Sequence, residues 1–325
     1  MKAFQYSRVD TVEAAIGAAT ASSRFLGGGT NLVDLMKDGV ETPDTLIDVT
    51  RLPLADIAPL PNGGLRVGAT ARNSDTADHP LVRQHYPLLA QAILAGASPQ
   101  LRNMATNGGN LMQRTRCPYF MDPGFRQCNK RLPGSGCDAR DGLDRNHAVL
   151  GYSAACIATH PSDMCVALLA LDATIRVRGP QGERMIPMGE FHRLPGDTPQ
   201  FDTTLQPGEL ILSIDLPPSS FARHYRYLKV RDRHSYDFAL VSVAAALDVE
   251  GGRIRAARVA LGGVAHKPWR APAAEALLQG QPPDQGLFRR AARQAFADAR
   301  PLSHNGYKIP LGQEAIVTAL QDALA

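Results

Sequence analysis

The hydrophobic residues of this chain recur with the period of a helix in some segments and with the two-residue period of a strand in others. The order of these segments predicts an α+β fold. Near the N-terminus three short apolar runs are expected to be strands: 1–7, 23–27 and 45–50. Amphipathic stretches with a helical period separate these runs. The pair Asp10 and Glu13 is expected to begin the first helix, with Ala15 and Ile16 facing inward. Strands that alternate with helices predict a parallel sheet in a small subdomain over residues 1–55.

The pattern changes after Pro53, where the alternation typical of antiparallel strands becomes more common. One long helix is expected at 80–95, in a second subdomain over 56–216 that completes a domain over 1–216. The strands expected in this subdomain are 64–72, 174–179, 184–188 and 209–217.

Consecutive prolines at 217–220 predict a linker, because they end any regular element. Three strands then predict an antiparallel sheet in a C-terminal α+β domain over 221–325. The helices expected to back this sheet are 271–279, 286–300 and 313–323.

Composition narrows the class of protein. The chain has 325 residues, 44% of them hydrophobic, and a formal net charge of +4. This charge is too small to indicate nucleic acid or an anionic membrane as the main partner. The most apolar run, 239–247, is interrupted by Ser242 and is shorter than the ~20 residues that cross a bilayer. Because Asp10 and Glu13 interrupt the pattern of a secretory signal, we expect no signal peptide.

A run of three glycines is the first candidate binding site. Gly27, Gly28 and Gly29 lie between a predicted strand and a predicted helix, which Thr30 and Asn31 can cap. Glycine lets the main chain approach a ligand closely, and free amides at the start of a helix attract a phosphate. A tight turn without a ligand is the alternative interpretation.

A second loop, ATNGGNL, has the same features. Gly108 and Gly109 permit close approach, while Thr106 and Asn110 supply hydrogen bonds. Neither loop matches G-x-G-x-x-G or a Walker A motif. Two such loops in one domain indicate an extended ligand with two phosphates, which points to a dinucleotide.

Three of the five cysteines lie in one irregular loop, expected at 114–146. There are ten, eight and eighteen residues between the members of the set Cys117, Cys128, Cys137 and Cys156, and no C-x-x-C pair. Four thiolates in a loop of this kind can hold a [4Fe-4S] cluster or a structural zinc, and the spacing does not choose between them. A surface loop with free cysteines and a basic contact for a partner also stay open.

Basic residues surround these cysteines and can compensate the negative charge of a thiolate-bound cluster. They are Arg114, Arg116, Arg126, Lys130 and Arg131. The fifth cysteine, Cys165, lies on an apolar helix face and is interpreted as a core residue.

Five segments, taken in chain order, resemble the flavin-binding subunit of the molybdenum hydroxylases, the family of xanthine dehydrogenase and carbon monoxide dehydrogenase. They are FLGGGTNLVDLMK, TNGGNL, HPSDM, KVRDR and LGGV. The resemblance covers essentially the whole chain. It implies a two-subdomain FAD-binding domain of the vanillyl-alcohol-oxidase/CO-dehydrogenase flavoprotein type, followed by the C-terminal domain of that flavoprotein.

The resemblance also implies which residues bind FAD, with the first glycine loop on the pyrophosphate and the second in contact with the same cofactor. The implicated residues are Gly27, Gly28, Gly29, Thr30, Asn31, Leu32, Thr106, Gly109, Asn110, Asp163, Ile211 and Lys229. Asp163 can accept a hydrogen bond from a ribose or a ring N–H, and Lys229 can bias the electronics of the flavin. The alternatives are that Asp163 caps a helix and that Lys229 is a solvated strand residue.

A subset of this family carries an insertion after the second glycine loop. The segments RCPYF, CNKRLPGSGC, HAVLG and ACIATHPSDM are very similar to the flavin subunit of bacterial, periplasmic molybdenum aldehyde oxidoreductases. The resemblance implies that Cys117, Cys128, Cys137 and Cys156 ligate a [4Fe-4S] cluster.

Function and partners follow from the same resemblance. It implies an FAD-binding electron-transfer subunit of an aldehyde oxidoreductase, in a complex with a molybdenum-cofactor large subunit and a [2Fe-2S] small subunit. Electrons are expected to pass from the [2Fe-2S] clusters to FAD and on to a terminal acceptor, with no side chain acting as acid or base. The complex is expected in the periplasm through co-export with a signal-bearing partner, or else in the cytoplasm. A stand-alone flavoprotein oxidoreductase and a zinc-bearing module that binds nucleic acid are the alternatives.

Overall fold

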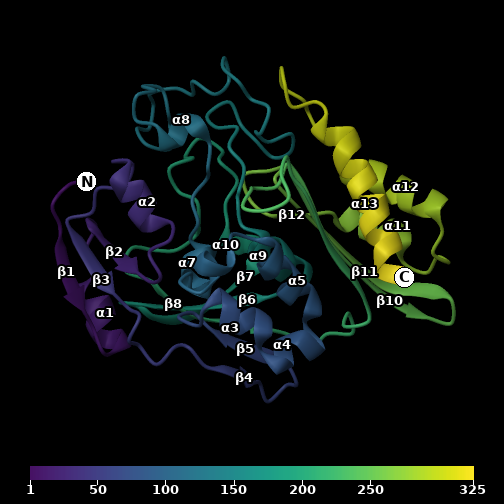
Figure 1. Ribbon diagram of the computed structural model, residues 1–325, viewed down its shortest axis with the longest axis horizontal. Helices are drawn as coiled ribbons and strands as arrows, with labels where there is room; N and C mark the ends of the chain where they lie inside the picture. The colour runs from purple at the N-terminus through teal and green to yellow at the C-terminus, as the bar shows by residue number, and fades with distance from the viewer.

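The computed structural model describes residues 1–325 as three sheets with helices packed on them. In Figure 1 the N-terminal sheet lies at one end, a five-stranded sheet lies in the middle, and a four-stranded sheet with the C-terminal helices lies at the other end. None of the helices combines the length and the apolarity that crossing a bilayer requires.

The first sheet is parallel, as the alternation of its elements predicts, with the strand order β1-β3-β2. Its elements are β1 (Gln5–Arg8), α1 (Val12–Ala18), β2 (Ser23–Leu26), α2 (Leu32–Lys37) and β3 (Thr45–Asp48). The expected start of α1 was wrong in detail. Thr11 is the N-cap, because its Oγ1 accepts the amide of Ala14 at 3.1 Å.

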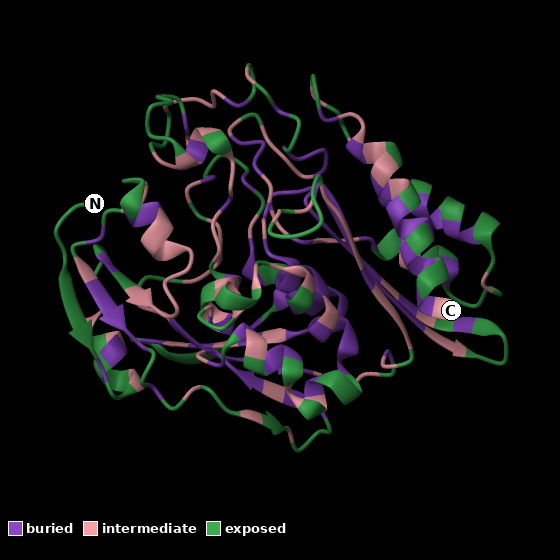
Figure 2. Cartoon of the chain, in the orientation of Figure 1, coloured by how far each residue is buried: buried purple, intermediate pink, exposed green.

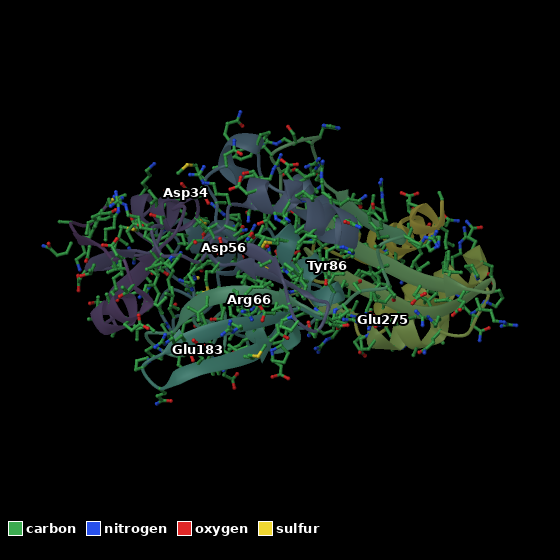
Figure 3. The ribbon with its side chains drawn as sticks, turned by 90° about the horizontal axis from the view of Figure 1, so that it is seen from below. Asp34, Asp56, Arg66, Tyr86, Glu183 and Glu275 are labelled. Atoms are coloured by element: carbon green, nitrogen blue, oxygen red, sulfur yellow. The ribbon has the colours of Figure 1, made fainter.

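The middle sheet is antiparallel, with the order β4-β5-β8-β6-β7. Its strands are β4 (Ile57–Pro59), β5 (Leu65–Gly68), β6 (Thr174–Gly179), β7 (Gly182–Pro187) and β8 (Leu210–Leu216). Strand β8 is buried throughout, since Leu210 and Leu212 pack against the first unit while Ile211 and Ile214 belong to the main core. The opposite face carries charged side chains, among them Arg66 and Glu183, which Figure 3 labels.

Helices cover the apolar face of the middle sheet. They are α3 (Asn73–Asp78), α4 (Pro80–His85), α5 (Pro87–Ala95), α6 (Pro99–Arg102), α7 (Asn107–Leu111), α9 (Asp163–Ala170) and α10 (Met188–Phe191). A further short helix, α8 (Pro118–Met121), belongs to the cysteine loop and packs against Leu35 of α2. The single helix expected over 80–95 was wrong. Tyr86 interrupts it, because Pro87 lacks an amide and disfavours helical geometry at the preceding residue.

The third sheet is antiparallel, as expected, but it has four strands instead of three. Its elements are β9 (His224–Val230), β10 (Val241–Glu250), β11 (Arg253–Gly262), β12 (Trp269–Arg270), α11 (Pro272–Leu278), α12 (Gln285–Ala295) and α13 (Lys308–Leu324). Strand β12 has two residues, which are too few to give an alternating pattern.

Both faces of the third sheet are covered, which explains the continuous apolar run in β10. Val243 and Ala245 face the core formed with α11, α12 and α13. Ala244 and Ala246 face the main core, which contains α5 and α9. Figure 2 shows the resulting buried layer on the strands between the two sets of helices.

Candidate cofactor sites

The two glycine loops pack directly against each other. A Cβ on Gly28 would lie 1.8 Å from the carbonyl oxygen of Met104, and one on Gly27 would lie 2.5 Å from Oγ1 of Thr106. Gly29 has a φ of +76°, a backbone conformation that residues with a side chain rarely adopt. Thr106 in turn begins α7, because its Oγ1 accepts the amide of Gly109 at 3.2 Å. The two loops therefore form one surface. The contact between them explains why Gly27 and Gly28 have no room for a side chain.

The first glycine loop leaves its main-chain amides free. None of the amides of Gly27, Gly28, Gly29, Thr30 and Asn31 donates to a backbone carbonyl. The side chain of Asn31 adds another free donor, since its Nδ2 is buried without a partner while its Oδ1 accepts the amide of Arg114 at 3.2 Å. Leu32, also implicated from the sequence, is the first residue of α2. Consecutive free amides beside a helix start are the donor set that suits a diphosphate, so these residues fit FAD.

The second glycine loop is supported from below by β8 and by a network of amide side chains. The amide of Gly108 donates to the carbonyl of Ala69 at 2.8 Å, and the amide of Ala69 donates to that of Leu212 at 3.0 Å. Ile211, the neighbour of Leu212, is buried in the core and makes its contribution by packing. Asn110, also implicated from the sequence, is a member of this amide network.

Asn110 is fixed by side-chain hydrogen bonds on three sides. Its Nδ2 donates to Asn73 at 2.7 Å, and its Oδ1 accepts from Ser162 and from Gln113, each at 2.6 Å. Asn73 continues the network to the fully buried Asn107 at 2.9 Å. Sequence reasoning missed Asn73 and Asn107, and the only signal was the position of Asn107 inside the second loop.

Asp163 and Lys229 contact each other. Lys229 Nζ lies 2.8 Å from Oδ2 of Asp163, and both side chains are almost fully buried. Tyr227 donates its hydroxyl to Oδ1 of Asp163 at 2.7 Å, and burial beside this carboxylate raises the pKa of Tyr227. Both alternative interpretations were therefore wrong, because Ser162 caps α9 and Lys229 is not solvated. Tyr227 was missed, although its two-residue spacing from Lys229 places both on one face of β9.

A pocket of about 130 Å³ lies between the cysteine loop and the third sheet. Cys117 and His147 line it on one side, and Asp163, Phe238 and Gly263 line it elsewhere. The pocket joins the region of the Asp163 ion pair to that of the cysteine loop.

The cysteine loop brings its thiols together. Cys128 and Cys137 pair as an antiparallel bridge, and Gly134 and Gly136 between them have positive φ. Burial, with smaller contributions from Cys156 and Cys128, raises the pKa of Cys117 to about 12. Burial likewise raises the pKa of Cys156 to about 11, with Cys137 and Cys128 acting in the same direction. The four thiols are free of disulfides and near enough to influence one another's pKa, but no three of their sulfurs lie within 4.8 Å of one another, a wider spacing than a single zinc ion requires. Four thiols at this wider spacing fit the corners of an iron-sulfur cluster.

Other groups reach the thiol of Cys117. Nε2 of His147 lies 3.1 Å from its Sγ, and the amides of Tyr119 and Phe120 lower its pKa by hydrogen bonding. Burial lowers the pKa of His147 to about 4, so the ring is neutral at pH 7. The carbonyl of His147 is near the side-chain amide of Asn305, from the C-terminal unit, at 3.4 Å.

The basic residues of the loop are used differently from what we expected. Arg116 pairs with Asp34 of α2, and Arg131 donates to the carbonyls of Tyr119 and Phe120. Only Lys130 acts on a cysteine, since its charge lowers the pKa of Cys156. Arg126 is exposed.

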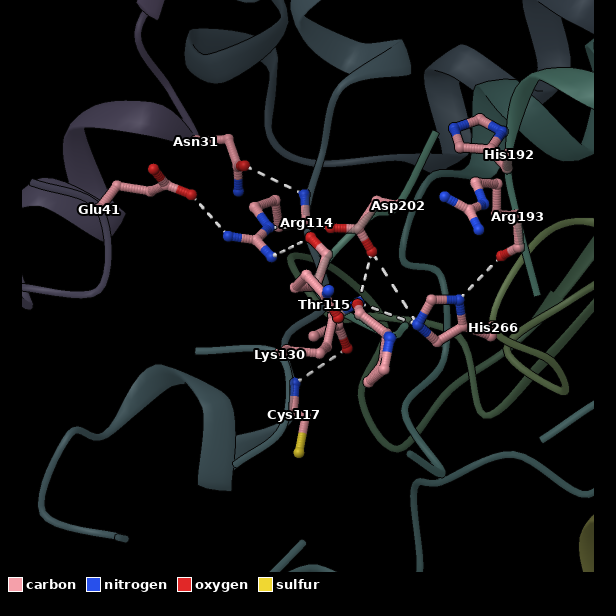
Figure 4. Close-up of polar contacts among 12 residues, drawn as sticks. Asn31, Glu41, Arg114, Thr115, Cys117, Lys130, His192, Arg193, Asp202 and His266 are labelled. Carbon is pink, nitrogen blue, oxygen red and sulfur yellow. Dashed lines mark hydrogen bonds and ion pairs between the residues drawn. The ribbon is translucent and has the colours of Figure 1, made fainter. Parts of the chain in front are cut away.

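Figure 4 shows where Arg114 and Lys130 lie: both are bound to Asp202. Nε of Arg114 is 2.9 Å from this carboxylate and Nζ of Lys130 is 2.5 Å from it, and these cations lower the pKa of Asp202. Lys130 Nζ is also 2.9 Å from Nε2 of His266 in the third unit, and burial lowers the pKa of His266 to about 4. These polar contacts attach the cysteine loop to all three units.

Cys165 is fully buried in α9, as expected for a core residue. Burial raises the pKa of its thiol to about 12, and its nearest ligand-type neighbours are His160 and His192, within 4.8 Å. Nδ1 of His160 accepts the amide of Ser162, and Nε2 of His192 faces the carbonyl of Leu111. The two remaining ring nitrogens, Nε2 of His160 as a donor and Nδ1 of His192 as an acceptor, are buried without a hydrogen-bond partner.

The chain matches two family models that together span it. Residues 2–219 match the FAD binding domain in molybdopterin dehydrogenase, and residues 223–323 match the CO dehydrogenase flavoprotein C-terminal domain. The predicted linker at 217–220 overlaps the end of the first match and lies between β8 and β9.

Relatives and solved structures agree with these models. The aldehyde oxidoreductase FAD-binding subunit PaoB of Escherichia coli is 52% identical over 328 residues, covering 100% of this chain and 99% of that protein. The glyceraldehyde dehydrogenase medium chain of Sulfolobus acidocaldarius is 28% identical, covering 93% and 91%. A carbon monoxide dehydrogenase structure from Hydrogenophaga pseudoflava superposes with a TM-score of 0.77 at 26% identity, covering 99% of this chain and 97% of that one. The chain therefore belongs to the FAD-binding medium-subunit family of the molybdenum hydroxylases, and it is an oxidoreductase subunit.

Proposed function

We propose that this chain is the FAD- and [4Fe-4S]-binding electron-transfer subunit of a molybdenum-dependent aldehyde oxidoreductase. The observation that carries the flavin part is the run of free amides from Gly27 to Asn31, beside the unpartnered Nδ2 of Asn31. The aldehyde part is supported by the 52% identity to an aldehyde oxidoreductase FAD-binding subunit over the full length of both chains.

FAD, when bound, supplies the redox chemistry, and the residues of this chain bind and orient it. The free amides of the first loop bind the diphosphate, and Thr106 keeps the second loop in contact with the first. Asp163 is held by Lys229 and Tyr227 in a low-dielectric environment, where a carboxylate is a strong acceptor for a ribose or ring N–H. No side chain is required to act as an acid or a base.

The same proposal assigns Cys117, Cys128, Cys137 and Cys156 to a [4Fe-4S] cluster. The support is that the three thiols of the loop and that of Cys156 influence one another's pKa without forming disulfides, whereas none of them acts on Cys165. The raised pKa values of Cys117, Cys137 and Cys156 mean that metal binding must displace protons, so loading is expected to be favoured by higher pH. A zinc ion would use the same donors, and elemental analysis separates the two.

We further propose a complex with a molybdenum-cofactor large subunit and a [2Fe-2S] small subunit. Relatives named as medium chains of glyceraldehyde dehydrogenase and carbon monoxide dehydrogenase support it, since that term presupposes larger and smaller chains. Electrons would enter this chain from the small subunit and leave from FAD to a terminal acceptor.

The test is purification of the full chain under anaerobic conditions, followed by absorbance spectroscopy, iron and sulfide analysis, and EPR after reduction. We expect one flavin and about four irons for each chain. A Gly28→Ala variant is expected to lose flavin, whereas Gly17→Ala, where a Cβ meets nothing within 4 Å, is expected to retain it. Protein without flavin would contradict the proposal. Zinc without iron would favour the zinc-bearing module, and aldehyde turnover by the isolated chain would favour a stand-alone flavoenzyme.

A further inference from the structure

Helix α2 touches both candidate cofactor sites. Asn31, whose side chain carries a free donor of the first glycine loop, is its N-cap residue. Leu35, on the same helix, is fully buried and packs in one small apolar cluster with Phe120 and Cys128 of the cysteine loop. In Figure 1 the segment that carries α8 lies near the top of the view, above α2. A short helix is thus shared by two binding sites that are far apart in the sequence.

Arg114 connects α2 to the cysteine loop at two points. Its amide donates to Oδ1 of Asn31 at 3.2 Å, which directs the buried Nδ2 of that side chain away from Arg114. Its guanidinium binds Glu41 at 2.5 Å, and the amide of Glu41 donates to the carbonyl of Leu35 at 3.1 Å. Arg114 therefore fixes both the residue that starts α2 and the turn that follows it.

The other side of Arg114 belongs to the cysteine loop. Its guanidinium stacks on the ring of Phe120 at 4.7 Å and shares Asp202 with Lys130, which follows Cys128 by two residues. Most of the Arg114 side chain is buried, so its contacts are made in a low-dielectric environment. If the loop moves, Phe120 and Lys130 move with it, and Arg114 loses its stacking partner and the second cation on Asp202.

We propose that Arg114 is a positioning residue that couples the two sites, so that closing the cysteine loop around a metal cluster raises the affinity of the first glycine loop for FAD. This inference rests on the proposed function. The coupling is reciprocal by linkage, so FAD binding must also favour retention of the cluster. Asn31 is the residue through which the effect reaches the flavin.

The first experiment requires no substitution. The full wild-type chain is stripped of flavin, and the dissociation constant for FAD is measured by quenching of flavin fluorescence, with the iron present and after its removal by an anaerobic chelator. We expect removal of iron to weaken FAD binding by about 5- to 150-fold, the range typical of coupling between two sites. Equal dissociation constants in the two states would overturn the inference.

The second experiment tests the residue. Arg114→Gln is compared with Arg126→Gln, which changes an exposed arginine of the same loop. We expect the ratio of dissociation constants with and without iron to fall toward one in Arg114→Gln and to stay at the wild-type value in Arg126→Gln. Arg114→Lys, which keeps the charge but not two simultaneous ion pairs, is expected to give an intermediate ratio.

The outcomes separate this inference from the proposed function. A wild-type chain that binds no FAD in either state contradicts both the proposed function and the coupling. A chain that binds FAD and iron independently contradicts only the coupling. Should Arg114→Gln not fold, the wild-type comparison and Arg114→Lys still decide the result.

Discussion

Lys229 and Asp163 form a buried ion pair between two regions of the chain that are 66 residues apart. Lys229 comes from the first strand of the C-terminal unit, and Asp163 begins α9 of the middle unit. Tyr227 binds the second carboxylate oxygen, so the carboxylate has a partner on each side. The pair therefore joins the two regions that the family models match separately.

Replacement of Lys229 by Met is expected to destabilise the chain by about 3–5 kcal/mol, because it leaves a carboxylate buried without its counterion. The measurement is the free energy of unfolding in urea, monitored by circular dichroism. Arg83→Met is the control, since Arg83 and Asp78 are 3.5 Å apart and mostly exposed. Its expected cost is below ~1 kcal/mol. Similar losses in the two variants would contradict the role of burial.

Serine replacements at Cys117, Cys128, Cys137 and Cys156 are each expected to lower the iron content of the purified chain to near zero. Each removes one of four ligands, and the remaining thiols hold a cubane cluster poorly. Iron is measured by inductively coupled plasma mass spectrometry beside protein-bound sulfide. Cys165→Ala is the matched control and should retain full iron, since Cys165 lies in the core of α9. Iron retained in any of the four serine variants would remove that residue from the ligand set.

His147→Leu is expected to make the reduction potential of the proposed cluster more negative. Its Nε2 lies 3.1 Å from Sγ of Cys117, and a hydrogen bond to a ligand sulfur stabilises the reduced state. The midpoint is measured by EPR-monitored redox titration, with the exposed His85→Leu as control. An unchanged midpoint in a variant that retains its iron would show that His147 only packs against the thiol.

Acid is expected to destabilise the chain well before its carboxylates are protonated. Burial lowers the pKa of His192 and of His266 from 6.5 to about 4 each. Because the pKa of each ring is lower in the folded state, the unfolded chain binds more protons than the folded chain below about pH 6.5. The stability that these neutral rings contribute above that pH is therefore lost as the pH falls toward 4. Thermal midpoints measured between pH 7.5 and pH 4.5 should fall continuously. His192→Gln should reduce this slope, and the exposed His85→Gln should leave it unchanged.

The period of the apolar residues was sufficient to predict the parallel first sheet and the antiparallel third sheet, because both depend on local alternation. The break at Tyr86 was not predicted, although Pro87 is its cause and is visible in the sequence. Strand β12 is too short to leave a pattern, and the cap at Thr11 depends on a side-chain rotamer that the sequence does not specify.

The site was less accessible to sequence reasoning than the fold. The glycines were predicted from their run between a strand and a helix, and the structure gives a local reason for two of them, the φ of +76° at Gly29 and the approach of Gly28 to Met104. The pairing of Lys229 with Asp163 was missed, since the two residues were considered separately as flavin contacts. Arg114 was assigned to charge compensation, but its carboxylate partners lie in other units and are not visible from the local sequence.

The residues that hold the end of the cysteine loop lie near the C-terminus. Asp144 accepts the amides of Ser303 and His304, and Asn305 donates to the carbonyl of Ala148 at 3.0 Å. On the ribosome the four cysteines emerge about 150 to 190 residues before these partners, because synthesis runs from the N-terminus. A nascent chain thus exposes the thiols before it can shape the loop around them. If the loop holds the proposed cluster, its iron is expected to be inserted after translation has ended.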